Sequence, residues 1–307
     1  MQVLFKRMSI NRSFGIEIEM NPNLTKKSIV KIIRESSNKP LRQSGWELTQ
    51  NNNSYWHLKT DSSCGDPGWE LATYKADSNK DLNDICNVAK NLHKAGAKTD
   101  SDTGLHIHIG IEDFDLEQVG IMMARWVKIE NFILQSVRCH RRENYFCRPV
   151  SKHKKFRKKK FYSSDEFWNL IRPKRYGLFG NPQRRLALNM LNYAISVYRP
   201  HVNRNLKTVE FRFPEGTTCP IDIRNRTCLF LNFVENSKTA SMPSDLTAVQ
   251  DLNLFLEYFG LENSDNFIIL SKPLNSLKLW LLNRLETHAE SKKIKSQVLD
   301  KIKIVAS

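Results

Sequence analysis

The stretch Phe14-Gly15-Ile16-Glu17-Ile18-Glu19-Met20 alternates charged and apolar side chains along most of its length. Successive side chains of a β-strand point to opposite faces, so both glutamates lie on one face and the isoleucines on the other. The pattern recurs at Leu105-His106-Ile107-His108-Ile109 and at Thr208-Val209-Glu210-Phe211-Arg212-Phe213. Charged groups on a half-buried face are costly unless something compensates them. These three strands predict a charged site on one face of a sheet.

Carboxylates and imidazoles together favour a divalent cation, and a neighbouring arginine favours phosphate. The residues therefore indicate metal-assisted phosphoryl chemistry. Gly104, just before the histidine pair, would let the backbone approach a ligand closely. Each motif also has a simpler interpretation that the residues leave open. The glutamate pair could face solvent, the two histidines could be hydrogen-bonded core residues, and Glu210 with Arg212 could form a salt bridge. The loop that begins at Asp61 adds a fourth segment, with Glu70 as a further carboxylate ligand.

The composition is that of a globular protein, with 307 residues and 40% hydrophobic side chains. No apolar run reaches the roughly 18 residues that span a bilayer, and the start does not resemble a secretory signal. The six cysteines have no regular spacing, which is typical of reduced thiols, so we expect a cytoplasmic protein. Cys139, Cys147 and His153 could supply zinc ligands, but no Cys-x-x-Cys pair accompanies them.

The formal net charge is +16, and much of the excess lies between Arg138 and Arg185. Such a segment attracts polyanions, such as nucleic acid or an anionic carrier, and the aromatic residues within it are compatible with nucleic-acid contact. A solvated insertion loop is the alternative. We expect no membrane partner.

Strands are expected at 46–49, 55–60, 69–73, 186–191 and 206–213, in addition to the strands around Glu17 and His106. Helices are expected after Thr25, from Ser78 to Gly96, over 116–137, after Ser164 and from Pro220. The chain beyond residue 244 has a helical pattern. Because strands and helices do not alternate regularly, we predict an α+β fold on a mostly antiparallel sheet. We expect a domain at 1–244, with a basic insertion at about 138–185, and a helical extension at 245–307.

These motifs resemble the amidoligase family of the carboxylate–amine ligase superfamily, which is similar to glutamine synthetase and γ-glutamylcysteine ligase. The resemblance covers about residues 14–217. It includes the segment from Asp61 to Leu71, Val209-Glu210-Phe211-Arg212, Arg141-Arg142-Glu143-Asn144-Tyr145-Phe146-Cys147 and Arg185-Leu186-Ala187-Leu188-Asn189. The resemblance implies a curved sheet, a half-barrel like that of glutamine synthetase, with helices on its outer face and with ATP and Mg²⁺ or Mn²⁺ in its concave face.

The resemblance also implies roles for individual residues. Metal ligands would be Glu17, Glu19, Glu70, His106 and Glu210. His108 and Asn189 would lie near the nucleotide, and Arg212 would bind the γ-phosphate. From the chemistry of the side chains, we consider Asp61 a candidate for steering the amine, and Arg141, Arg142 and Arg185 candidates for holding the substrate carboxylate or acyl phosphate. The implied activity is an ATP-dependent ligase that joins a small-molecule or peptide carboxylate to an amine through an acyl phosphate.

Two other functions stay open on the sequence. Acids and histidines beside a basic segment also suit a metal-dependent phosphoesterase or nuclease. A basic nucleic-acid-binding protein with an inactive ligase fold is the non-enzymatic alternative.

Overall fold

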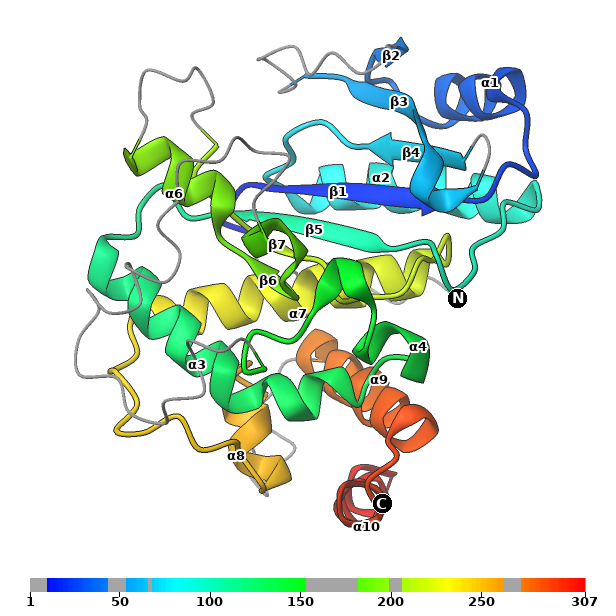
Figure 1. Cartoon of the computed structure of the whole chain (residues 1–307). Coiled ribbons are helices and arrows are strands. Elements are labelled where there is room, and N and C mark those ends of the chain that lie inside the picture. The colour runs from blue at the N-terminus through cyan, green and yellow to red at the C-terminus, as the bar shows by residue number, and fades with distance from the viewer. Residues whose placement is uncertain are drawn as a thin grey trace.

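The structure is a computed structural model that describes residues 10–43, 54–65, 68–152, 182–198, 206–261 and 272–306. Its centre is a seven-stranded sheet in the order β2-β3-β4-β1-β5-β7-β6 (Figure 1). The strands are β1 (Phe14–Met20), β2 (Leu41–Gln43), β3 (Trp56–Asp61), β4 (Gly68–Ala72), β5 (Leu105–Gly110), β6 (Leu188–Asn189) and β7 (Thr208–Phe211). The sheet is mixed: β2 runs parallel to β3, and the other neighbouring strands are antiparallel.

The described helices are α1 (Lys26–Ser36), α2 (Asn79–Lys94), α3 (Leu116–Leu134), α4 (Cys139–Arg142), α6 (Leu191–Tyr198), α7 (Pro220–Lys238), α8 (Leu252–Glu257), α9 (Lys272–His288) and α10 (Lys292–Ala306). Thr25 and Ser78 cap α1 and α2, because their hydroxyls accept hydrogen bonds from first-turn amides. Pro220 opens α7, where its missing N–H does no harm. Helices and strands thus confirm the α+β class.

One face of the sheet packs into the hydrophobic core. Ile16 and Ile18 of β1 and Ile107 of β5 are at most 1% exposed. The apolar sides of α2 and α7 pack in the same core, and both helices lie behind the sheet in Figure 1. Since side chains alternate along a strand, the glutamates and histidines of β1 and β5 are left on the opposite face.

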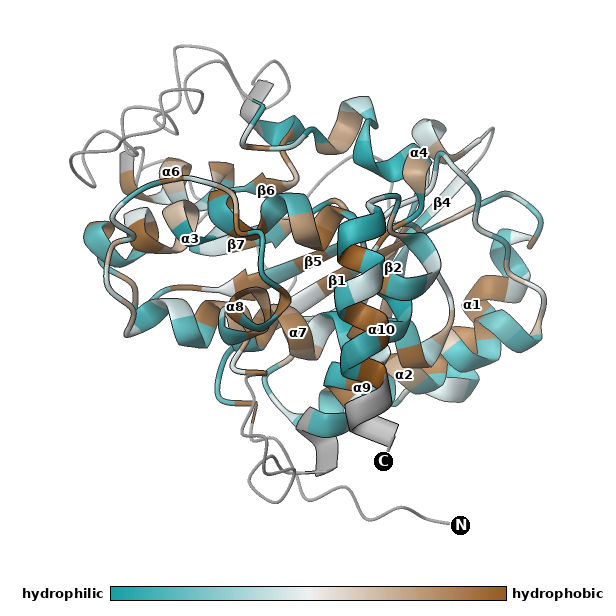
Figure 2. Cartoon of the chain, turned by 90° about the horizontal axis from the view of Figure 1, so that it is seen from below, coloured by the Kyte–Doolittle hydropathy of each residue, from teal (hydrophilic) through white to brown (hydrophobic). Residues whose placement is uncertain are grey.

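The C-terminal helices α8, α9 and α10 contribute to this same core through buried residues such as Phe255, Leu281 and Val298. Both α9 and α10 carry hydrophobic residues among hydrophilic ones (Figure 2), and the two helices pack against each other. The helical pattern expected beyond residue 244 is therefore present, while the domain boundary there stays a prediction. None of the described helices is long and apolar enough to cross a membrane.

One expectation about secondary structure was wrong, and one strand was missed. Only Leu188–Asn189 of the stretch 186–191 is a strand, and Leu191 already begins helix α6. The side chain of Asn189 explains the change of direction, because its Oδ1 accepts the Leu191 amide. Strand β2 was not expected at all. The strand predicted at 46–49 and the helix predicted after Ser164 lie outside the described residues.

Candidate active site

The charged side chains form three rows across the sheet, set by the pairing register. In the first row Lys59 of β3 faces Glu70 of β4, which in turn faces Glu19 of β1. The second row pairs Glu17 with His106. The third row runs from His108 through Glu210 to Asn189. Four carboxylates and two imidazoles that are up to 193 positions apart in sequence therefore share one face (Glu17, Glu19, Glu70, His106, His108, Glu210).

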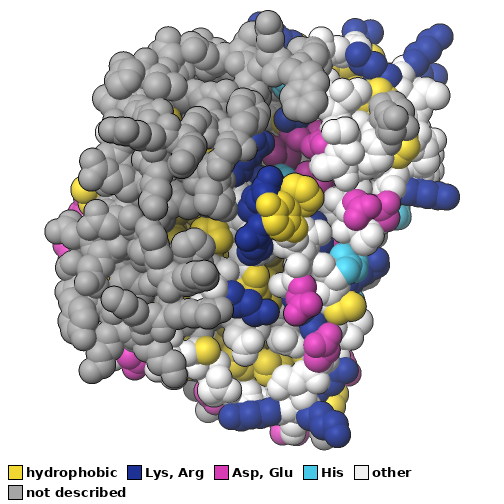
Figure 3. All heavy atoms as spheres, viewed as in Figure 1, with side chains coloured by type: hydrophobic (Ala, Val, Ile, Leu, Met, Phe, Trp, Pro, Cys, Tyr) yellow, Lys and Arg dark blue, Asp and Glu magenta, His cyan; other side chains and the backbone are white. Residues whose placement is uncertain are grey.

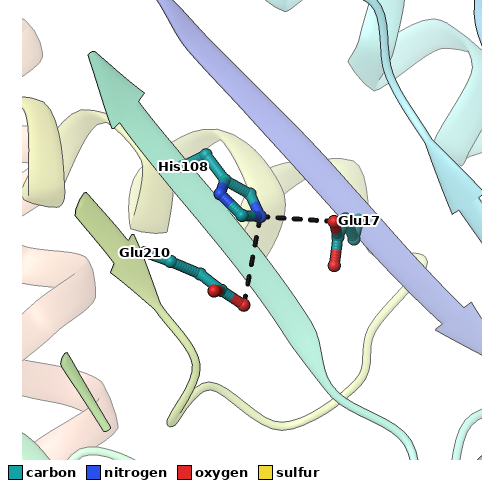
Figure 4. A group of neighbouring side chains, drawn as sticks. All are labelled: Glu17, His108 and Glu210. Carbon is teal, nitrogen blue, oxygen red and sulfur yellow. Dashed lines mark ion pairs between the residues drawn. The ribbon is translucent and has the colours of Figure 1, made fainter. Parts of the chain in front are cut away.

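Glu17, His108 and Glu210 form a group whose ligating atoms lie within 4.8 Å of one another (Figure 4). The Nε2 atom of His108 is 3.3 Å from a carboxylate oxygen of Glu17 and 3.9 Å from one of Glu210. One imidazole thus lies between carboxylates from two other strands. At this spacing all three side chains can bind the same cation.

The second imidazole, His106, is held between the two glutamates of β1. Its Nδ1 atom lies 3.1 Å from Glu17 and its Nε2 atom 3.5 Å from Glu19. Glu19 also accepts a hydrogen bond from the Gly104 amide. The side chains of Glu19 and His106 are almost completely buried, so these contacts form away from bulk water.

The electrostatics of this face differ from residue to residue. Burial raises the pKa of Glu70 to about 8, and the nearby Glu17 carboxylate acts in the same direction. Burial would also raise the pKa of Glu17, but His108 and His106 hold it well below its usual value. Against the effect of burial, Glu210 and Glu17 raise the pKa of His108 to about 9. Burial and neighbouring acids thus disfavour the ionised form of Glu70, and a bound divalent metal ion would favour that form.

Three side chains of the site approach the backbone closely at Gly104. A Cβ atom there would lie 2.9 Å from Nη2 of Arg141, 3.0 Å from Nε2 of His106 and 3.1 Å from Oε2 of Glu19. A glycine is needed for this close approach of side chains, while the approach of a ligand expected from the sequence stays a prediction. The buried Arg141 lies beside two predicted metal ligands, and its guanidinium donates to the backbone carbonyls of Arg212 and Phe213.

Arg212 and Asn189 both contact Glu210. The Arg212 guanidinium pairs with one carboxylate oxygen of Glu210, and its Nε donates to the Phe146 carbonyl at 3.3 Å. The Asn189 amide donates to the other oxygen of Glu210 at 2.6 Å. Arg212 and Asn189 therefore orient Glu210, while the roles predicted for them toward the nucleotide stay predictions.

Asp61 lies at the end of β3, where it accepts hydrogen bonds from the amide and hydroxyl of Ser63. It forms a second group of ligating side chains with Glu19 and Cys64, again within 4.8 Å. The buried thiol of Cys64 was not predicted, because a single cysteine in a polar loop carries no signal in a sequence.

Lys59 was also missed. Its ammonium lies 2.7 Å from Glu70, and despite burial the carboxylates of Glu70 and Glu17 raise its pKa. The alternation of β3 places Lys59 on the same face as Asp61, and this signal could have identified it.

Arg185 and Arg142 lie in different surroundings. The Arg185 guanidinium lies over the Tyr145 ring, 4.2 Å from its centroid, at the rim of the site. Arg142 does not reach the site: it donates to the Leu134 and Val137 carbonyls and pairs with Glu290. We therefore withdraw Arg142 as a residue that holds the substrate.

The zinc ligands considered above are not brought together in the described residues. Cys139 is exposed, whereas Cys147 is buried and donates to the Arg141 carbonyl. Neither belongs to a group of metal-ligating side chains among the residues described. His153 lies outside them.

Seen from the side of Figure 1, acidic side chains occupy a recess near the middle of the molecule, with basic and hydrophobic side chains beside it (Figure 3). The arrangement provides carboxylates and imidazoles for cations and guanidinium groups for anions. These are the groups that phosphoryl transfer requires.

Comparison with solved structures finds a bifunctional glutathione synthetase from Pasteurella multocida, at 10% sequence identity and a TM-score of 0.40. The match covers 97% of this chain but 47% of that enzyme, so the chain spans about half its length. A likeness this weak carries no argument about fold or activity. Among curated proteins nothing matches the chain.

The family comparison is more informative. The family described as "Putative amidoligase enzyme" matches residues 10–234. The match includes β1, β4, β5 and β7, the four strands that carry the carboxylates and imidazoles. It covers most of the 307 residues. The chain therefore belongs to the amidoligase family.

Proposed function

We propose that this protein is an ATP-dependent ligase that joins a carboxylate to an amine through an acyl phosphate. The observation that supports this most strongly is the three-row face of the sheet, where four carboxylates, two imidazoles and Arg212 meet in an amidoligase chain. We further propose that the sheet curves into a half-barrel around the substrates, as in glutamine synthetase, and that the enzyme works in the cytoplasm.

The residues on this face fit Mg²⁺ or Mn²⁺. Glu17, Glu19, Glu70, His106 and Glu210 would hold the ions, and the position of His108 between Glu17 and Glu210 suits it equally well as a ligand. Bound ions would neutralise the phosphate charges of ATP and of the leaving ADP. The raised pKa of Glu70 supports this assignment, because the ionised carboxylate lacks sufficient counter-charge among these residues.

The arginines act on the anionic groups of the reaction. In the first step a carboxylate oxygen attacks the γ-phosphorus of ATP, and the bond to ADP breaks. Arg212 is well placed to bind the transferred phosphoryl group, because its guanidinium already lies against a carboxylate of the site. Arg141 holds the backbone at Arg212 and Phe213 and so fixes the end of β7.

In the second step the amine nitrogen attacks the acyl carbon, and the bond from that carbon to the phosphate oxygen breaks. The amine must lose a proton, and we assign Asp61 at the end of β3 to steer it and accept that proton. No side chain forms a covalent bond with the substrate. Orientation of the two reactants can supply about 7–11 kcal/mol of the barrier reduction.

A direct test follows from the site residues. We expect Glu19→Ala, His106→Ala and Arg212→Ala each to reduce carboxylate- and amine-dependent ADP release by about 100-fold or more. The substrates come from a screen of amino acids, peptides and polyamines for an ATP-dependent gain in mass. Removal of Glu19 relieves repulsion among buried carboxylates, so the fold should survive, as circular dichroism would check.

Glu35→Ala is the matched control, because it removes an exposed glutamate of α1 that pairs only with Lys31 among the described residues. It should retain full turnover. Full turnover in any two of the three site variants would contradict the assignment of the site.

The phosphoesterase or nuclease alternative predicts a different requirement. Such an enzyme would cleave a phosphodiester without ATP, a carboxylate or an amine. ADP release that needs both organic substrates would therefore exclude it.

A further inference from the structure

An aromatic pair with two arginines lies at the rim of the proposed active site. Tyr145 and Phe146 are 51% and 48% exposed, and their rings meet edge to face. The guanidinium carbons of Arg148 and Arg185 lie over the Tyr145 ring, 4.0 Å and 4.2 Å from its centroid. We call these four residues the rim cluster.

The rim cluster is fixed to the edge of the sheet. The Arg148 amide donates to the Arg185 carbonyl, and the Ala187 amide donates to the Arg148 carbonyl, both at 2.8 Å. The Arg212 amide donates to the Ala187 carbonyl at 2.9 Å, and its side chain donates to the Phe146 carbonyl. The cluster is therefore joined directly to the arginine that we assign to the phosphoryl group.

The positive charge of the rim cluster is not balanced by carboxylates of the described residues. No carboxylate of the described residues pairs with Arg148 or Arg185, whereas Arg142, Arg212 and Arg226 each pair with a glutamate. Arg148 donates from Nε to the Tyr145 carbonyl, and Arg185 donates from Nη1 to the Tyr145 hydroxyl. A guanidinium has five N–H groups, so each keeps further donors for a planar anion such as a carboxylate. The half-exposed Phe146 ring next to it offers a flat apolar surface.

We propose that the rim cluster binds the carboxylate substrate, and that this substrate carries a carboxylate next to a flat apolar group, as the end of a short peptide with an aromatic side chain does. The carboxylate would lie against Arg148 and Arg185 and the apolar group against Phe146. A long polyanion fits less well, because the four carboxylates of the active site lie beside the cluster. This proposal rests on the proposed ligase function, but the binding that it predicts does not require ATP.

The test uses the full-length protein and N-acetylphenylalanine, with binding measured by calorimetry in the absence of ATP. We expect the double variant Arg148→Gln/Arg185→Gln and the variant Phe146→Ala each to raise Kd at least about tenfold. N-acetylphenylalaninamide, which lacks the carboxylate, should bind at least about tenfold more weakly than the acid. Lys152→Gln removes an exposed cation of the same region and should leave Kd unchanged.

The proposal is overturned if the amide binds as tightly as the acid, or if the wild-type protein binds neither. It is also overturned if adenosine monophosphate or an oligonucleotide binds more tightly and depends on the same arginines, since the cluster would then serve nucleotides. The experiment measures binding and not turnover. Its result can therefore be interpreted even if the protein has no ligase activity. Thermal unfolding of each variant checks that Kd changes do not come from loss of fold.

Discussion

At the residue scale, Gly104 controls how closely the groups of the active site approach one another. Its missing side chain leaves the space between Arg141, His106 and Glu19. Arg141 cannot withdraw easily, because it is buried and bonded to two backbone carbonyls. A methyl group added at residue 104 therefore tests whether the close packing of these three side chains is needed for metal binding.

We predict that Gly104→Ala costs about 1–3 kcal/mol of stability through overpacking. It should also weaken Mn²⁺ binding about 10- to 100-fold by displacing Glu19 and His106. Electron paramagnetic resonance of free Mn²⁺ measures the second effect.

Gly15→Ala is the control, since Gly15 faces His108 in the neighbouring strand and its Cβ would meet only Thr73, at 3.9 Å. Equal Mn²⁺ affinity in both variants would show that the space at Gly104 is irrelevant to metal binding.

The sequence could predict which side chains share a face, because alternation along Glu17-Ile18-Glu19 needs only local geometry. It could not predict the strand order, and so it could not show that Glu17 faces His106 or that Glu70 faces Glu19. Alternation along β3 could have placed Lys59 on the face of Asp61, but its contact with Glu70 on another strand could not be predicted. Long-range pairing, and not local pattern, decides these contacts.

At the element scale, the long elements were predictable and the short ones were not. Helix α2 has a serine cap and apolar residues at helical spacing, so several signals agree. Strand β6 has only two residues, and α6 follows it directly. Asn189 accepts from the Leu191 amide and donates to Glu210, and the second bond exists only once β7 is in place.

One buried carboxylate adds an ion pair to the hydrophobic contacts that attach α9 to the rest of the fold. Glu215, which follows β7, accepts from Arg226 of α7 at 2.7 Å and also pairs with Arg284 of α9. Burial would raise the pKa of Glu215, but Arg226 and Arg284 lower it from 4.5 to about 2. The ionised form is therefore the one that the folded state favours.

The sign of the pH effect follows from this lowered pKa. The stabilisation is fully present above pH 4.5, declines as the pH falls toward 2, and is lost below it. A shift of this size corresponds to about 3 kcal/mol. We predict that Glu215→Gln lowers the unfolding free energy at pH 7 by about 3–5 kcal/mol and removes the part of the acid sensitivity between pH 4.5 and 2 that Glu215 contributes.

Urea unfolding at several pH values measures this effect. Glu112→Gln, which removes an exposed partner of Lys75, should change the free energy of unfolding by less than about 1 kcal/mol. A Glu215 variant that unfolds like this control would show that the arginine pair does not hold α9.

At the scale of the whole molecule, the charge distribution raises a separate question. The formal net charge is +16, yet the face of the sheet that carries the proposed site is rich in carboxylates. The basic run at 152–160 is a plausible source of polyanion binding, and its lysines from 153 onward lie outside the described residues. Polyanion binding and catalysis should then be separable, because different parts of the chain carry them.

We predict that the protein binds single-stranded RNA with a steep salt dependence that does not change in the Glu17→Ala/Glu19→Ala variant. The test variant replaces five lysines of the basic run by glutamine (Lys154, Lys155, Lys158, Lys159, Lys160). The slope of log K against log salt should become shallower by about 3 to 4, since each lost phosphate contact contributes about 0.7. Turnover of small substrates should stay unchanged, whereas KM for a large anionic substrate should rise.

The control variant carries the same change in charge on α1 and α2, at exposed lysines (Lys26, Lys27, Lys31, Lys90, Lys94). If only the net charge matters, both variants lose RNA affinity equally, because long-range attraction depends on the sum of charges. If the basic run makes the contacts, only its variant changes the slope. Tight RNA binding in a protein without ADP release would instead favour an inactive ligase fold that binds nucleic acid.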